Sequence, residues 1–135
     1  MNPRGFSLIE LLIVLAIVAL LAAVALPAWQ AQRDRAQRND ARAWLIRLSN
    51  DQQAHFVRAG HYAPDLRGLG FTTPVAATPG GHYQLSVVAT SPTGFTVRAS
   101  RIAADREARR CAWYTLDQTQ QRASGPEGIE ECWWR

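Results

Sequence analysis

The chain has 135 residues, with 15 basic side chains, all of them arginine, against 11 acidic ones and a formal net charge of +4 at pH 7. A chain of this length forms one domain, which excludes multidomain architectures and disfavours a large cleft enzyme. Most of the apolar bias lies near the N-terminus, because Glu10 is the only ionisable residue between Phe6 and Trp29.

This apolar block is long enough to cross a membrane as a helix, which takes about 20 residues. A cleaved secretory signal is the alternative, since Ala23-Val24-Ala25 would leave a soluble protein that starts at Leu26. The block is longer than the core of such a signal, it follows a single arginine, Arg4, and it contains a carboxylate. These features favour a membrane helix.

Glu10 needs a partner, because a carboxylate inside a membrane helix is costly. No cation lies within the apolar block. We therefore expect the partner to be another chain or a freed N-terminal amine.

The run Gly5-Phe6-Ser7-Leu8-Ile9-Glu10-Leu11-Leu12-Ile13-Val14 resembles the class III signal of type IV pilins and of type II secretion pseudopilins. The resemblance implies that a prepilin peptidase cuts between Gly5 and Phe6 and methylates the new N-terminal Phe6. It also implies that Glu10 pairs with a neighbouring subunit's amine during assembly. The leader is short, and Ser7 stands where threonine is frequent in the family.

A single long helix is predicted after the leader, because no glycine occurs between Gly5 and Gly60. Pro27, the only proline in that span, is expected to bend it. We expect a leader peptide at 1–5, a transmembrane and assembly helix at 6–29, an amphipathic half of that helix at 30–60, and a loop with an antiparallel sheet and a disulfide region at 61–135.

The outer half of the helix shows one stripe of less polar residues at spacings of three and four, which predicts a buried face. The stripe consists of Ala41, Trp44, Leu45, Leu48, Gln52, His55 and Phe56. The charged residues around it are expected on a solvated or subunit-facing surface, helped by pairs such as Asp34 with Arg38. They are Arg35, Arg38, Arg42, Arg47 and Asp51.

Strand patterns appear only in the second half of the chain. Apolar and polar residues alternate over 83–89 and over 95–100 on either side of a turn at 90–94, which predicts a hairpin. A third strand is predicted at 111–117, and the arginine-rich segment 101–110 is expected to be an exposed excursion. The fold class is therefore α+β, with a three- to four-stranded antiparallel sheet packed on the helix, as in the type IV pilin fold.

Cys111 and Cys132 are the only cysteines. In an exported body one disulfide is the simplest interpretation, with two free thiols as the alternative. A closed loop of about 22 residues is worth roughly 3 kcal/mol. The resemblance implies the same device, a C-terminal bridge around a variable loop.

No constellation of residues predicts an enzyme, a cofactor or a metal site. His55, His61 and His82 are isolated in sequence and lack metal-ligand spacing. Gly68-Leu69-Gly70 lacks the third glycine of a nucleotide-binding loop.

Several arginines are candidate contacts with DNA or with a partner protein, namely Arg98, Arg101, Arg106, Arg109 and Arg110. Together with Arg122, Trp113, Trp133 and Trp134 they have the composition of a groove that binds phosphate and stacks bases. Some minor pilins capture DNA during uptake. The favoured alternative is that the arginines lie on solvated loops and that the tryptophans cover the disulfide.

The resemblance implies a structural subunit of a type IV pilus, most like minor pilins of the PilE kind, that supports twitching motility and adhesion. Its partners would be other major and minor pilins, the prepilin peptidase, an inner-membrane assembly platform and, before assembly, membrane lipid. The alternatives are a major pilin, a type II secretion pseudopilin, a DNA-binding minor pilin, or a plain membrane-anchored or secreted domain.

The expected location is the inner membrane, as a single-pass protein with the C-terminal body in the periplasm, and then the cell-surface pilus. The positive-inside rule predicts the opposite orientation, since five arginines follow the apolar block: Arg33, Arg35, Arg38, Arg42 and Arg47. The family and the paired cysteines favour an exported body, because long domains translocate largely regardless of charge.

Overall fold

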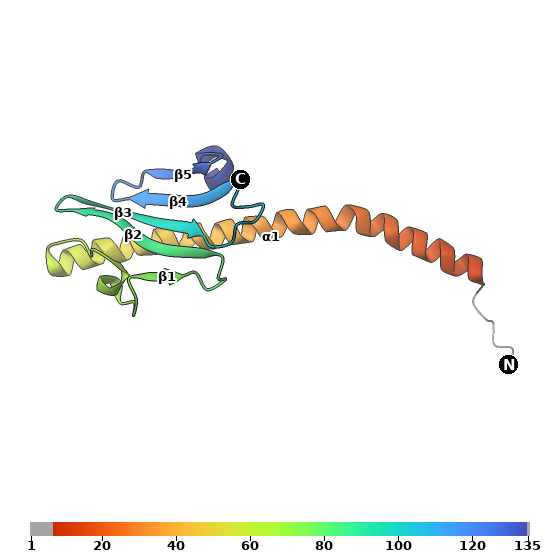
Figure 1. Ribbon diagram of the computed structural model, residues 1–135, viewed down its shortest axis with the longest axis horizontal. Coiled ribbons are helices and arrows are strands. Elements are labelled where there is room, and N and C mark those ends of the chain that lie inside the picture. Colours follow the sequence, from red (N-terminus) through yellow and green to blue (C-terminus); the bar gives the residue numbers. More distant parts are fainter. Residues whose placement is uncertain (1–6, 135) are drawn as a thin grey trace. The chain divides into compact units, whose positions relative to one another are not determined.

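The computed structural model describes residues 7–134, and the chain forms two compact units that divide between Asp34 and Arg35. One helix, α1 (Leu8–Ala59), runs through both units, which confirms the predicted long helix (Figure 1). It ends where the glycine predicts, because Gly60 has a φ of +74° and its N–H donates to the Phe56 carbonyl at 2.8 Å. Pro27 lies inside the helix, and its role as a bend stays a prediction.

The C-terminal unit contains one five-stranded antiparallel sheet whose strands follow each other in chain order (Figure 1). The strands are β1 (Val75–Ala77), β2 (Tyr83–Ser91), β3 (Gly94–Arg101), β4 (Cys111–Asp117) and β5 (Arg122–Pro126). A short 3₁₀ helix, η1 (Leu66–Leu69), precedes the sheet, and a π-helical turn, η2 (Glu130–Trp134), follows it. The meander places every strand beside its sequence neighbour.

The predicted hairpin is confirmed as β2 and β3, although its turn is tighter than expected because Ser91 pairs directly with Gly94. The predicted third strand is β4, with the same bounds. The two edge strands, β1 and β5, make the sheet larger than the three or four strands expected. This difference has a physical reason, since β1 is only three residues long and β5 contains a glycine and a proline.

The core lies between the helix and one face of the sheet. Ala41, Leu45 and Leu48 of α1 are fully buried, as the stripe predicts. They face a cluster of buried strand residues that includes Tyr83, Leu85, Phe95, Val97, Ala99, Tyr114 and Leu116. Gln52 is also fully buried, and its side-chain amide exchanges two hydrogen bonds of 2.8 Å with the backbone of Ala63. These two hydrogen bonds hold the segment after α1 against the helix.

One prediction for the helix surface is wrong. Arg38 was expected on the solvated face in a pair with Asp34, but its side chain is only 4% exposed and it binds Glu107. A buried guanidinium is tolerated here because a carboxylate and a carbonyl satisfy its N–H groups. Arg47 and Asp51 do lie on the surface, where they form a loose i, i+4 pair at 3.9 Å.

Candidate functional site

From Leu8 to Trp29, α1 is an uncovered apolar helix apart from Glu10. Its large side chains are exposed along the whole described length, from Leu8 at 77% through Leu20 at 71% to Trp29 at 67%. An 18-residue window of this helix has a mean hydropathy of 3.0 and none of it is buried, so it is apolar and long enough to cross a membrane. Such a surface is stable only when lipid or other apolar helices cover it.

Glu10 lies within the first turn of this helix and is exposed among apolar neighbours. The predicted cleavage and methylation site, Gly5 and Phe6, lies outside the described residues. The roles of Gly5, Phe6 and Glu10 therefore stay predictions.

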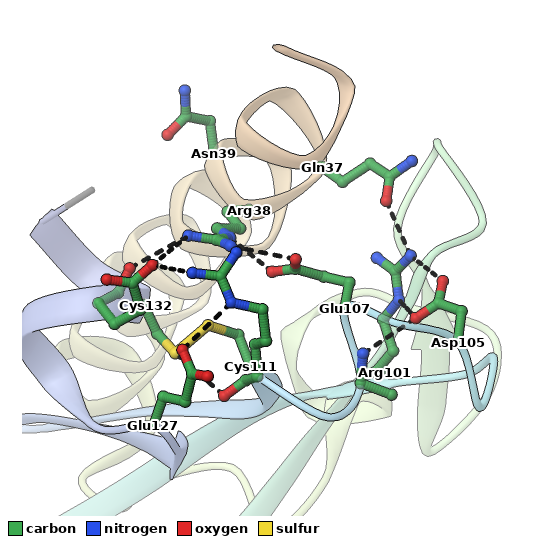
Figure 2. A network of polar contacts seen from close by, with 12 residues as sticks. Gln37, Arg38, Asn39, Arg101, Asp105, Glu107, Cys111, Glu127 and Cys132 are labelled. Carbon is green, nitrogen blue, oxygen red and sulfur yellow. Dashed lines mark hydrogen bonds and ion pairs between the residues drawn. A yellow bond between two sulfur atoms is a disulfide. The ribbon is translucent and has the colours of Figure 1, made fainter. Parts of the chain in front are cut away.

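A network of arginines ties the helix to two distant parts of the body (Figure 2). Arg38 donates from Nε to Glu107 at 2.5 Å and from Nη2 to the other carboxylate oxygen at 3.1 Å, which makes the pair bidentate. It also donates to the Glu131 carbonyl at 3.1 Å. One turn later, Arg42 donates to the Cys132 carbonyl from two nitrogens. The helix thus binds both the segment between β3 and β4 and the C-terminal turn.

The predicted disulfide between Cys111 and Cys132 is confirmed, with Cα atoms 5.6 Å apart, and both residues are fully buried. It joins the start of β4 to η2 beside the arginine network (Figure 2). Trp133 covers this region, as its ring packs against Tyr114 at 5.7 Å and its indole N–H donates to the Ala123 carbonyl at 3.0 Å. The expectation that the tryptophans cover the disulfide thus fits Trp133, whereas Trp134 is 60% exposed.

Two of the candidate DNA-contact arginines are engaged in ion pairs with carboxylates of the body. Arg101 is 4% exposed, binds Asp105 and donates to the Gln37 side chain at 2.8 Å (Figure 2). These hydrogen bonds from Arg101 hold the pKa of Asp105 below its usual value. Arg110 pairs with the carboxylates of Glu127 and Glu131.

Arg98 lies on the outer face of the sheet, opposite Ser86 on β2 and Thr115 on β4. Its guanidinium carbon lies 5.0 Å from the centre of the Trp113 ring, and its Nε is buried with no hydrogen-bond partner. The ring in turn lies flat against Gly125, where a Cβ would come within 2.8 Å of it. The outer face thus presents a cation that no carboxylate of the described chain is seen to neutralise.

The other candidate arginines are distributed separately. Arg106 and Arg109 are exposed on the segment between β3 and β4. Arg122 stacks on two tryptophan rings, 5.2 Å from Trp133 and 4.7 Å from Trp134. The five candidate arginines therefore lie in different surroundings, and Arg98 is the one on the outer face of the sheet.

The histidines of the described chain do not gather with other metal-ligating side chains. His55 and His61, which are isolated in sequence, have ring centres 5.4 Å apart at the end of α1. Within residues 7–134 no group of three or more metal-ligating side chains occurs.

Two buried tyrosines border the arginine network. Tyr83 and Tyr114 are fully buried, with ring centres 5.7 Å apart. Burial raises the pKa of each phenol above the ordinary value of 10.0, because desolvation penalises the phenolate.

These phenols predict a loss of stability in alkali. Below about pH 10 both phenols are protonated in the folded chain and in the unfolded chain, so the free energy of unfolding does not depend on them. As the pH rises further the unfolded chain releases its phenol protons first, so folding weakens by up to about 1.4 kcal/mol per pH unit for each tyrosine. Urea midpoints of the full chain in detergent should therefore fall as the pH rises from about 10 to 11. Tyr83→Phe should reduce that slope, and an unchanged midpoint across this range would contradict the account.

Comparisons with known proteins agree with this architecture. The family model described as "Prokaryotic N-terminal methylation motif" matches residues 1–26. The model described as "Type IV minor pilin ComP, DNA uptake sequence receptor" matches residues 27–115. The chain belongs to the type IV pilin family.

Individual relatives are pilins as well. The chain is 34% identical over 98 residues to the wide pilus major component PilA4 of Thermus thermophilus, covering 73% of each chain. It is 39% identical over 90 residues to a major pilin PilE1 of Neisseria gonorrhoeae, which covers 64% of this chain but only 40% of that relative. A type IV pilin structure from Shewanella oneidensis, 23% identical, matches 66% of this chain and 89% of its own with a TM-score of 0.50, and thus shares the fold.

The chain thus has the N-terminal motif and the fold of the type IV pilins. The long apolar helix and the disulfide follow the prediction from sequence, whereas the Arg38–Glu107 pair and the inward engagement of Arg101 were not predicted. Little in the sequence indicates the Arg38–Glu107 pair, since Glu107 stands among four arginines in an irregular segment.

Proposed function

We propose that the chain is a minor pilin that is stored in the inner membrane and then incorporated into a type IV pilus. The exposed apolar helix is the observation that carries this proposal, because lipid and neighbouring pilin helices are the two environments that can cover it. The match of residues 1–26 to the methylation motif supports cleavage after Gly5 and methylation of Phe6 by a prepilin peptidase. An inner-membrane assembly platform and other pilins are the partners of this function.

We place the body in the periplasm. The five arginines after the apolar block do not prevent this orientation, because long domains translocate largely regardless of charge. Alkaline phosphatase joined to the C-terminus tests the orientation, because that enzyme matures only outside the cytoplasm. An active fusion supports the proposal, and an inactive fusion with a stable, membrane-bound product contradicts it.

A second candidate function is capture of double-stranded DNA. The matching minor-pilin model is described as a DNA uptake sequence receptor, and Arg98 and Trp113 both lie inside the matched range. The Arg98 side chain is half-buried and has hydroxyl-bearing neighbours across both strands, so the exposed part of its guanidinium suits contact with a phosphate oxygen. Trp113 is held against Gly125 and Arg98, so it orients the guanidinium and is not open to intercalate.

Replacement of Arg98 tests this second function. Arg98→Gln should weaken binding of a duplex several-fold and lower the slope of log affinity against log salt by about 1, because one phosphate contact is lost. Arg58→Gln is the matched control, since Arg58 is exposed in the last turn of α1, away from the outer face of the sheet. Equal affinities and slopes for the two variants would contradict a DNA site at Arg98.

A further inference from the structure

One edge of β2 lacks a neighbouring strand over half of its length. β1 pairs only with residues 84–86 of β2, although β2 continues to Ser91 (Figure 1). Residues 88–91, which we call the open edge, are all exposed, and the Val88 side chain is 49% exposed. Such an edge presents backbone N–H and C=O groups with which another extended chain can form hydrogen bonds.

The backbone groups of Thr90 point toward the free side of the open edge. Thr90 pairs with Phe95 of β3, and the Phe95 N–H donates to the Gln118 side chain, on the β4 side, at 3.2 Å. The two residues are therefore a non-hydrogen-bonded pair, in which each turns its N–H and C=O away from the other. Val88 is the extra residue of the bulge and has no partner in β3. Within residues 7–134, no other segment forms a backbone hydrogen bond with Val88 or Thr90.

A hollow of about 270 Å³ lies at the end of the open edge. It is lined by the segment after α1 and by the end of the hairpin, namely Gly60, His61, Tyr62, Thr90, Ser91 and Pro92. The Tyr62 ring is held between Phe56 and Phe95, with ring centres 4.6 Å and 4.9 Å away, so this wall of the hollow is fixed. An open edge beside a fixed hollow has the two parts of a strand-addition site, in which backbone hydrogen bonds give affinity and a pocket selects a side chain.

The surroundings of the open edge are uncharged. Residues 59–64 and 68–97 contain no Asp, Glu, Lys or Arg. Natural proteins commonly protect exposed edges with charged side chains, and this protection is absent here. The bulge at Val87–Ala89 is the one interruption, and residues 89–91 pair regularly beyond it. A charged segment would lose water at this edge without gaining a counter-ion, so the site favours a neutral one.

We propose that the open edge binds an extended, uncharged peptide segment of a partner protein, which adds a strand to the sheet outside β2. The segment exchanges hydrogen bonds with the backbone of Thr90 and places one neutral side chain in the hollow. All of the residues involved lie in the C-terminal unit. The proposal therefore goes beyond the pilin function proposed above and does not depend on membrane anchoring.

Three capped peptides of the form acetyl-Thr-Val-Thr-Val-X-amide, with Ala, Leu or Tyr as X, test the proposal. They would be added to the isotope-labelled full chain in detergent micelles, and the exchange of single backbone amides followed by NMR. We expect the Thr90 amide to exchange at least about fivefold more slowly with the Leu or Tyr peptide, because its N–H becomes hydrogen-bonded. The same peptide N-methylated at alternate residues should give no protection, since it lacks the donors of a pairing edge.

Two substitutions test the site by peptide affinity, measured by titration calorimetry. Thr90→Pro removes the outward N–H without removing a hydrogen bond of the sheet, and Val88→Lys adds the charge that protects natural edges. Each should weaken binding at least about fivefold. Ile46→Lys is the matched control and should bind normally, because Ile46 is a β-branched residue of α1 with a similar exposure of 42%. Near-ultraviolet circular dichroism checks that each variant is folded.

Failure of all three peptides to protect Thr90 would overturn the proposal. Equal protection by the N-methylated peptide would overturn it too, because binding would then not use strand pairing. Equal peptide affinities of the Val88→Lys and Ile46→Lys variants would place the binding elsewhere on the chain.

Discussion

Glu107→Gln should lower the free energy of unfolding of the body by about 3–5 kcal/mol. Glu107 and Arg38 are 2% and 4% exposed, and their bidentate contact is the link between α1 and the segment after β3. The substitution leaves the Arg38 charge buried without its counter-ion, which costs far more than the loss of one surface pair. Urea unfolding of the full chain in detergent, followed by tryptophan fluorescence, measures the change.

The matched control is Glu127→Gln, which removes the same charge from a pair with Arg110 in which both side chains are about 40% exposed. That change should cost no more than about 1 kcal/mol. A double replacement, Arg38→Met with Glu107→Leu, should recover much of the loss because both buried charges disappear together. A small effect of Glu107→Gln, similar to the control, would show that the pair does not hold the helix to the loop.

Glu10→Val should leave the chain in the membrane but reduce its amount in sheared pili by at least about tenfold. Valine removes a costly charge from the apolar helix, so insertion does not suffer. In the filament, however, the proposed partner amine of a neighbouring subunit would be buried without its carboxylate, and an unpaired buried charge costs about 3–5 kcal/mol. Quantitative mass spectrometry of pilus and membrane fractions measures both amounts.

Ile9→Val is the control, since it changes an exposed neighbour on the same helix without touching a charge. It should be incorporated normally. Normal incorporation of Glu10→Val as well would remove Glu10 from the assembly mechanism and leave apolar packing alone to drive it.

Regular elements could be predicted where the local pattern is strong. The absence of glycine between Gly5 and Gly60 predicts the whole of α1, and the β-prone run Cys111–Asp117 is β4 as observed. The edge strands depend on partners instead. β1 is three residues long, and β5 contains Gly125 and Pro126, so neither has a strong strand propensity of its own. Each forms because a longer neighbouring strand offers hydrogen bonds.

The polar network could not be predicted, because side chains far apart in sequence form it. Arg38 and Glu107 are separated by 69 positions, and Arg101 and Gln37 are separated by 64. In the sequence, the arginines of the helix and of the 101–110 segment look alike. Only the folded chain separates Arg38 and Arg101, which are buried and bound, from Arg98 on the outer face of the sheet.

The central claim is that the chain is processed as a prepilin and becomes a pilus subunit. The most direct test is mass spectrometry of intact protein from purified pili of the native host, with quantitation against the major subunit. We predict a chain that begins with N-methylated Phe6, contains the Cys111–Cys132 disulfide and occurs in a small fraction of the subunits. Absence of the chain from pili, together with a membrane form that starts at Met1 or a soluble form that starts at Leu26, would contradict the account.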